Sequence, residues 1–320
     1  DVAGLKPDAQ NDNRAGGSCT FDDNVTQGAL MFLMDLDAEV DTPWLTRAVE
    51  RGLDFMLDAQ FDNGAWAQRY PLAGGYHDYY TFNDAAINDC IKVLMRAHRQ
   101  YGDVRYLEGV RRAGDFLIQS QGEPPQAGWA QQYNHDTQPA WARGFEPPGY
   151  CSAVTARTMR TLVNLYVHTG DERYLAPVPP AIEWLQRSKL GDERWARLYE
   201  VGSNRPVYGD RNDPNKKHYD YSEISEEERN SYAWQGSYGI PEAIEYYRTV
   251  KEAGAAQYRE RREEESADVS APDVENVRAV MKSQDEEGRW VRDGEIRMET
   301  FIDNMRLLSA HLRGRAPGNQ

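Results

Sequence analysis

A short pattern that occurs three times along the chain constrains its fold more than any other feature. Each copy is a helix-like stretch ending in Gln, then a turn that contains Gly, then a Trp, and the copies lie at residues 54–68, 115–131 and 280–290. A second pattern, Gly-Asp-x-Arg-Tyr-Leu, occurs at 102–107 and 170–175 and predicts a joint between two helices with a Gly C-cap and an Asp N-cap. Helical pairs that recur every roughly 60–70 residues indicate like helices stacked around a common core.

Apolar residues at helical spacing predict an all-α chain. Between Pro43 and about residue 60, Leu45, Val49, Leu53 and Met56 recur three or four positions apart, which places them on one helix face. Further helices are predicted at 25–36, 83–101, 103–121, 152–168, 171–188, 222–253, 272–284 and 298–313. Because each helix has one apolar face, we expect the pairs to close into an α/α toroid, with the Gln-Gly-Trp turns opening on one cleft.

The chain has 52 acidic and 37 basic residues among 320, a net charge of −15. This balance argues against nucleic acid as a partner, because phosphate binding needs a basic face. No apolar run is long enough to predict a membrane span. We expect an irregular arm over residues 1–21, one domain over 22–320 and a monomer. The chain begins at Asp1 without an initiator Met, so we expect a trimmed product of a secreted or periplasmic protein whose signal is not in this chain.

Three cysteines, Cys19, Cys90 and Cys151, are far apart in the sequence and form no zinc-binding pattern. Cys90 lies in an apolar helical stretch and is predicted to be buried as a small hydrophobic residue. A single disulfide among the three remains open.

Aromatic and polar residues crowd the loop from residue 66 to 84. Trp66 and Tyr70 stand beside Gln, Arg and Asp side chains outside any predicted helix. Flat rings for sugar faces, with polar groups for hydroxyls, are typical of a carbohydrate cleft. The alternative is that Trp66 and Tyr70 are core residues whose polar groups find partners inside the protein.

Two aspartates in neighbouring repeats are candidate cation ligands. Asp84 stands at the start of a predicted helix, where plain capping is the alternative, and Asp136 lies outside any predicted helix. Their carboxylates would suit calcium, which accepts six to eight oxygen ligands in flexible geometry.

The candidate anion-binding residues are arginines, and arginine binds carboxylates bidentately. They are Arg143, Arg205, Arg211, Arg289 and Arg306. Arg205 and Arg211 share the loop 200–213, which Gly202, Pro206 and Gly209 make irregular. The alternative for this loop is a solvated connection, and for Arg143 it is an ion pair with Glu146.

Taken in order, these segments resemble the pectate lyases of polysaccharide lyase family 10. The matching segments are 63–72 (Asn-Gly-Ala-Trp-Ala-Gln-Arg-Tyr-Pro-Leu), 81–84 (Thr-Phe-Asn-Asp), 131–136, 140–148, 200–207, 232–234 and 300–306. The resemblance runs from about residue 22 to 313. The chain departs from the family pattern at Ala67, Arg69, Asn212, Asp213 and His218, which affects loop geometry and subsite preference.

The resemblance implies an (α/α)₃ toroid that cleaves polygalacturonate by calcium-assisted β-elimination to 4,5-unsaturated oligogalacturonides. Arg211 falls on the family's catalytic base, and Asp84 and Asp136 on its calcium ligands. The predicted substrate-binding set is Trp66, Tyr70, Asn83, Arg143, Arg205, Tyr219, Arg289 and Arg306. Free arginine has a pKa of about 12.5–13.8, so a guanidine base implies activity that rises toward alkaline pH.

Two other classes of function remain open. A glycoside hydrolase on an α-toroid would use Asp84 and Asp136 as acid and base. A noncatalytic pectin-binding toroid would bind the polymer without releasing product. Ultraviolet absorbance distinguishes them, because only elimination creates a conjugated unsaturated uronide.

Overall fold

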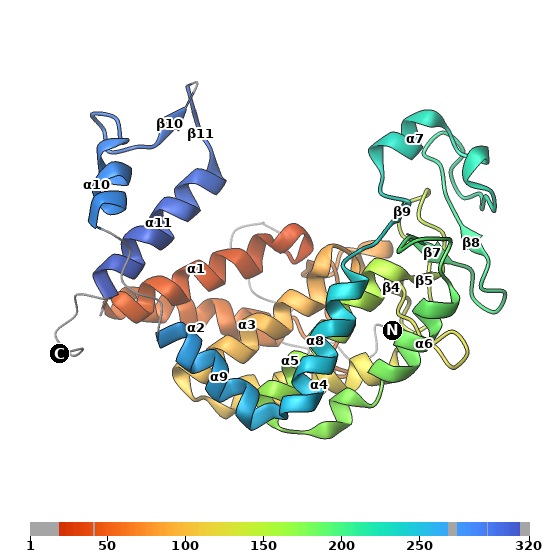
Figure 1. The fold of residues 1–320 in the computed structure, drawn as a ribbon, viewed down its shortest axis with the longest axis horizontal. Coiled ribbons are helices and arrows are strands. Elements are labelled where there is room, and N and C mark those ends of the chain that lie inside the picture. The colour runs from red at the N-terminus through yellow and green to blue at the C-terminus, as the bar shows by residue number, and fades with distance from the viewer. Residues whose placement is uncertain (1–18, 41, 268–273, 293, 314–320) are drawn as a thin grey trace. The chain divides into compact units, whose positions relative to one another are not determined.

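The computed structural model describes residues 19–40, 42–267, 274–292 and 294–313. It divides the chain into two compact units, Asp1–Ala256 and Gln257–Gln320 (Figure 1). The single domain expected over 22–320 therefore stays a prediction, and the expected arm falls largely outside the described residues. None of the described helices is long and apolar enough to cross a membrane.

Helical pairs form the first unit. They are α1 (Val25–Glu39) with α2 (Pro43–Asp58), α3 (Ala86–Tyr101) with α4 (Val104–Gln119), and α5 (Ser152–Thr169) with α6 (Val178–Arg187), followed by α7 (Glu226–Ser231) and α8 (Ile240–Ala253). In the order α1, α3, α5, α8, each helix packs against the next, while α2, α4 and α6 each pack against the first helix of their own pair. This is the arrangement of an α/α toroid, so the predicted fold class is confirmed (Figure 1).

In each copy of the repeated Gln-Gly-Trp turn, the Trp bonds to the end of the helix that precedes it. The last four carbonyls of a helix lack partners inside it, and each Trp indole donates to one of them. The bonds run from Trp66 to Met56 O (2.8 Å), Trp129 to Leu117 O (2.7 Å), Trp195 to Leu185 O (2.6 Å) and Trp290 to Val280 O (2.9 Å). The copy at Trp195 escapes the sequence pattern because Lys189 stands where the other copies have Gln.

Short antiparallel strands join the loops at the ends of these helices. The pairs are β1 (Cys19–Thr20) with β2 (Arg69–Tyr70), β3 (Tyr80–Thr81) with β4 (Gln132–Tyr133), β6 (Trp195–Ala196) with β9 (Gln235–Gly236), and the three strands β5 (Tyr150–Cys151), β7 (Leu198–Tyr199) and β8 (Pro206–Val207). Each strand has two residues, so the strands fix loops in place without forming a sheet layer.

The predicted helix over 222–253 is wrong as one element. The chain forms α7, passes through the extended segment that contains β9, and then begins α8. Tyr238 and Gly239 have φ values of 51° and 66°, and a continuous right-handed helix excludes positive φ. Similarly, the helix predicted over 171–188 is divided before α6, which begins directly after Pro177.

The second unit contains most of α9 (Ala255–Ala267), α10 (Val274–Lys282), the hairpin of β10 (Val291–Arg292) and β11 (Glu295–Ile296), and α11 (Met298–Arg313). Trp290 packs against Phe301, with ring centroids 5.9 Å apart. The helices predicted at 272–284 and 298–313 are confirmed. The three cysteines are free, and Cys90 is buried as predicted.

Candidate active site

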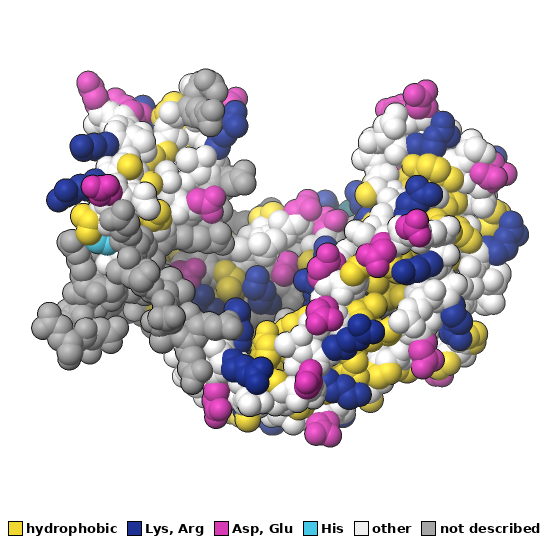
Figure 2. All heavy atoms as spheres, viewed as in Figure 1, with side chains coloured by type: hydrophobic (Ala, Val, Ile, Leu, Met, Phe, Trp, Pro, Cys, Tyr) yellow, Lys and Arg dark blue, Asp and Glu magenta, His cyan; other side chains and the backbone are white. Residues whose placement is uncertain are grey.

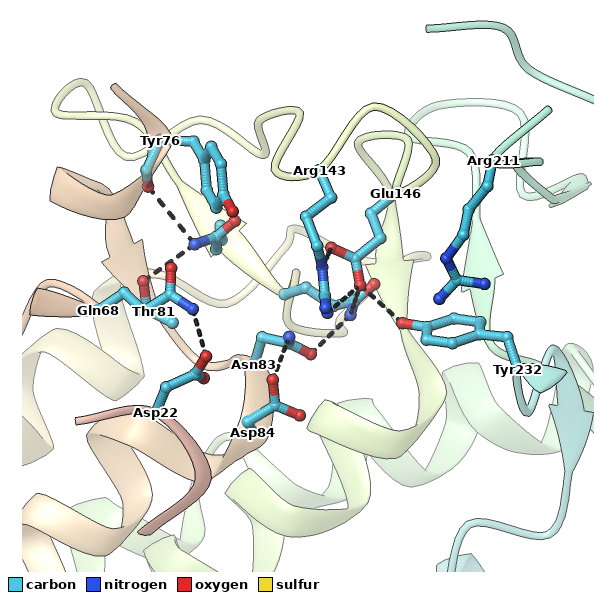
Figure 3. Close-up of polar contacts among 12 residues, drawn as sticks. Asp22, Gln68, Tyr76, Thr81, Asn83, Asp84, Arg143, Glu146, Arg211 and Tyr232 are labelled. Atoms are coloured by element: carbon cyan, nitrogen blue, oxygen red, sulfur yellow. Dashed lines mark hydrogen bonds and ion pairs between the residues drawn. The ribbon is translucent and has the colours of Figure 1, made fainter. Parts of the chain in front are cut away.

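Polar side chains from several loops of the first unit meet beside the start of α3. Figure 3 shows Asn83 and Asp84 below Arg143 and Glu146, with Arg211 and Tyr232 beside them. Asn83 and Asp84 belong to the turn that precedes α3. Arg143 and Glu146 come from the loop before β5, and Arg211 follows β8.

Two equivalent turns supply the carboxylates. Phe21 and Phe82 are both fully buried, and the turn after each contains two consecutive residues with positive φ. These residues are Asp23 and Asn24 before α1, and Asp84 and Ala85 before α3. The two turns contact each other. The fold therefore brings Asp22 and Asp23 toward Asp84.

The Asp84 carboxylate is destabilised as an anion. Burial, together with the negative charges of Asp22 and Asp23, raises its pKa to about 6, against a lowering by Arg143. The Asp22 carboxylate accepts a hydrogen bond from Gln68 Nε2 at 2.5 Å, but its Oδ1 is buried with no partner. A buried acceptor without a partner is costly, and a cation at this place would satisfy both carboxylates.

Asp136 lies in a different environment. It is exposed, and its backbone N–H donates to Asn134 Oδ1 at 3.1 Å. Its charge contributes, after burial, to the raised pKa of Tyr80, whereas the groups that shift the pKa of Asp84 are Asp22, Asp23 and Arg143. The structure thus pairs Asp84 with Asp22, and the role of Asp136 as a calcium ligand stays a prediction.

The sequence analysis missed Asp22. The signal that could have found it is a further repeated pattern: Thr-Phe-Asp-Asp at 20–23 matches Thr-Phe-Asn-Asp at 81–84, which aligns Asp22 with Asn83 and Asp23 with Asp84. Two copies of one turn, in contact at the ends of adjacent helices, predict two carboxylates in one place.

The carboxylate oxygens of Asp22 and Asp84 are the type of ligand that a hard cation prefers, but they are too few to fill its coordination shell. Among the residues that the structure describes, no three or more His, Cys, Asp or Glu side chains are grouped to hold a metal. Calcium takes six to eight oxygens, so carboxylates from Asp22 and Asp84 would leave positions for substrate and water. The unpartnered Oδ1 of Asp22 is the observation that supports the fit.

A hydrogen-bonded network connects Asp84 to the arginines. Asn83 Nδ2 donates to Asp84 Oδ2 at 2.7 Å, and Gln131 Nε2 donates to Asn83 Oδ1 at 2.8 Å. Gln131 also reaches Glu146 Oε1 at 3.5 Å. The buried Glu146 accepts two bonds from Arg143, at 2.8 and 2.9 Å. The ion pair that the sequence left as the alternative for Arg143 is therefore present, although the Arg143 side chain stays 42% exposed.

Arg211 reaches this network because its loop passes very close to the segment around Phe145. A Cβ atom on Gly209 would lie 1.9 Å from the Phe145 carbonyl oxygen, so only glycine permits this approach. The Arg211 guanidinium then stacks on the Phe145 ring, with Cζ 3.9 Å from the centroid. Its second neighbour is the ring of Tyr232, at 5.6 Å, whose hydroxyl donates to Glu146 at 2.7 Å.

Arg205, on the loop between β7 and β8, and Tyr219, on the loop after β8, come together. The Arg205 guanidinium lies 4.2 Å from the Tyr219 ring centroid. The Tyr219 hydroxyl donates to Glu200 Oε1 at 2.6 Å. Hydrogen bonds from Tyr219, Ser203 and Lys217 lower the pKa of Glu200 to about 2. The stacked pair remains a candidate sugar-binding surface.

Trp66 and Tyr70 are core residues rather than sugar-stacking platforms. Trp66 is 0% and Tyr70 5% exposed, and the Trp66 indole is bonded to the end of α2. The structure supports the core alternative for both rings, because a buried ring offers no face to a ligand, although the Tyr70 hydroxyl is buried without a hydrogen-bond partner.

Arg289 and Arg306 belong to the second unit. Arg289 forms ion pairs with Asp285 at 2.9 Å and with Glu287. The side chain of Arg306, on α11, lies outside the described residues. Their substrate-binding roles stay predictions.

A model of the family described as pectic acid lyase matches residues 3–194 and 186–242. The chain belongs to the pectic acid lyase family. It is therefore a polysaccharide lyase, and the family resemblance predicted from its sequence is confirmed.

Solved structures agree on the fold of this pectic acid lyase. A mutant family 10 polysaccharide lyase from Cellvibrio cellulosa, in complex with trigalacturonic acid, superposes with a TM-score of 0.64 at 22% identity, over 77% of this chain and 86% of that one. A family 10 polysaccharide lyase from the same organism gives a TM-score of 0.63 at 24% identity, over 74% and 85%. A search of curated proteins finds no match.

Proposed function

We propose that the protein cleaves pectate, that is polygalacturonate, by calcium-assisted β-elimination with Arg211 as the base. The observation that carries this proposal is the convergence of the Asp22–Asp84 pair with Arg143 and Arg211 beside α3. Membership of the pectic acid lyase family supports the substrate class, as does the trigalacturonic acid bound to the Cellvibrio cellulosa lyase.

Asp22 and Asp84 would hold the calcium ion, with Asp136 as a further candidate ligand. When bound, calcium supplies a Lewis acid that neutralises the uronate carboxylate and makes the neighbouring C5–H bond more acidic. The Arg143 side chain, half exposed beside this pair, can donate a charge-assisted hydrogen bond to the same carboxylate. Its attachment to the buried Glu146 fixes where that donor points.

Arg211 would remove the C5 proton in its neutral guanidine form. The electrons of the C5–H bond form the C4–C5 double bond, the C4–O4 bond breaks, and the leaving O4 takes a proton from water. The polymer fragment on one side of the broken bond then ends in a free O4 hydroxyl. The fragment on the other side ends in a 4,5-unsaturated uronide. Donors that are already oriented toward the developing negative charge lower the barrier without reorganisation.

Local charges, rather than the net charge, must attract the polyanion. Acidic and basic side chains are interspersed over the described surface of the first unit in view in Figure 2, and the chain as a whole carries −15. The cluster around Tyr232 brings together Arg143, Arg197 and Arg211, whose ring and ion-pair contacts include 4.5 Å between Arg197 Cζ and the Tyr232 ring. Such a site raises the local concentration of anions only nearby.

One observation favours the hydrolase alternative. A carboxyl group with a pKa of about 6, as in Asp84, is suited to a general acid in glycoside hydrolysis. In the lyase mechanism the same shift is expected of a cation ligand when the cation is absent. The reaction product decides between the two.

Because polymers do not cross membranes unaided, we propose that the enzyme acts in secreted or periplasmic form, as a monomer. The test of the function is incubation with polygalacturonate, with and without calcium, followed by ultraviolet absorbance. We expect absorbance to rise only with calcium. Release of reducing ends without absorbance would establish a hydrolase, and binding without either would establish a noncatalytic protein.

A further inference from the structure

Arg211 is held by a carboxylate to which the proposed reaction assigns no role. Arg211 Nη1 lies 2.7 Å from Glu228 Oε2, on α7. The side chain of Glu228 is only 2% exposed, whereas that of Arg211 is 46% exposed. A charge buried to this extent is stable only with a close partner, so Glu228 fixes the exposed guanidinium from the protein side.

Two hydrogen bonds fix Glu228, and a third fixes Ser225, the residue that caps its helix. Its Oε1 accepts a hydrogen bond from the buried Trp234 Nε1 at 3.2 Å. Its backbone N–H donates to Ser225 Oγ at 3.3 Å, which caps α7. Asp210, next to Arg211, accepts the Ser225 N–H at 2.5 Å. The start of α7 and the Arg211 loop are therefore tied together, so that the carboxylate and the guanidinium keep a constant relation.

The remaining surroundings of Arg211 restrict its orientation further. Phe145 covers one face of the guanidinium at 3.9 Å, and the Tyr232 ring lies at 5.6 Å. The charged or titratable groups nearest to it are Glu228 on α7, Tyr232, Asp210 on its own loop, and the Arg143–Glu146 ion pair of the facing loop. Glu228 is the one that contacts it as a counter-ion.

We propose that Glu228 is a positioning residue that aims Arg211 and strengthens it as a base, an inference that rests on the proposed role of Arg211. A base misplaced by about 1 Å can lose on the order of 100-fold in rate. In addition, a neighbouring carboxylate stabilises the guanidinium that forms once the C5 proton has been taken.

The test is the pH profile of Glu228→Gln, which keeps the shape and the Trp234 bond but removes the charge. We expect kcat at the alkaline plateau to fall about 10- to 100-fold, while KM for polygalacturonate stays within about twofold. The rising limb of the kcat profile should move to lower pH by about one unit. If kcat and the position of the rising limb in Glu228→Gln both match the wild type, the proposal is overturned.

Controls separate positioning from folding. Glu227→Gln removes an exposed charge from the same helix and should leave kcat and the pH profile unchanged. Glu228→Asp retains the charge, so its limb should stay near the wild-type pH although kcat falls. If Glu228→Gln fails to fold by circular dichroism, the Asp variant still decides the matter: a wild-type kcat in Glu228→Asp would refute the positioning role.

Failure of this inference differs from failure of the proposed function. If Arg211→Ala retains lyase activity, the assignment of the base is wrong. If Arg211→Ala is inactive while Glu228→Gln behaves as the wild type, the function stands and only the role of Glu228 is lost.

Discussion

The two halves of the candidate site are built in different ways. The carboxylate half comes from a repeated element, since Asp22 and Asp84 occupy equivalent turns before α1 and α3. The arginine half comes from longer loops, fixed by ion pairs to the buried Glu146 and Glu228. The comparison teaches that the toroid repeat can bring carboxylates together, while the position of the proposed base depends on contacts between loops.

The comparison would break most visibly at the base. Arg211→Ala should lower kcat on polygalacturonate by about 10³-fold, the scale of a lost general base, while binding of trigalacturonate persists. Initial rates by ultraviolet absorbance and calorimetric binding measure the two effects. Loss of binding together with loss of the circular dichroism spectrum would instead make Arg211 a structural residue.

Substituting Asp22 and Asp136 in turn tests which carboxylates of the candidate site bind calcium. Asp22→Asn should raise the calcium concentration for half-maximal activity by about 10- to 100-fold, because it removes a charged ligand. Asp136→Asn is the matched variant at the exposed aspartate. A large shift in Asp136→Asn with none in Asp22→Asn would restore the pair that the sequence first suggested.

Trp66→Phe tests whether the aromatic residue serves the core or the sugar. Loss of the indole bond to Met56 O should destabilise the fold by about 1–2 kcal/mol, since a buried carbonyl loses its donor. Urea unfolding measures this change, and KM for polygalacturonate should not move. An increase in KM with unchanged stability would contradict the core assignment.

The smallest effect concerns Asp84 and pH. A carboxyl group whose pKa is raised on folding, here to about 6, stabilises the fold below its unfolded pKa and loses that contribution as the pH rises through 6. Without calcium, Asp84→Asn should therefore be more stable than the wild type at pH 7 by roughly 1 kcal/mol, after allowance for solvent screening. Thermal unfolding at pH 5 and pH 7 measures the difference, which calcium should abolish in the wild type. Equal stabilities of Asp84→Asn and the wild type at both pH values would show that the charge of Asp84 does not destabilise the fold.

Local patterns predicted the helices well, and the reason is visible in the Gln-Gly-Trp copies. In each copy, the Trp of the loop bonds to the helix that precedes it. The residues that define the helix end therefore lie within about a dozen positions of one another. The prediction of one helix over 222–253 was wrong because the spacing of apolar residues carries no information on the positive φ at Tyr238 and Gly239.

Contacts between distant loops could not be predicted in this way. The Arg211–Glu228 ion pair depends on how α7 packs beside the Arg211 loop. The stacking of Arg211 on Phe145 depends on the close approach at Gly209. A run of three glutamates at 226–228 gives no sign that the third is buried. The Arg143–Glu146 pair, three residues apart, was within reach of the sequence and appeared there as an alternative.

The indole bonds at the helix ends carry a consequence for how such enzymes change. The helices α2, α4 and α6 each carry an indole bond at their end before the chain enters the loops around the candidate site. Insertions and replacements beyond these bonds leave the helix ends intact, so the loops can diverge while the helices keep their stability. Substrate preference and thermal tolerance are thereby open to separate selection.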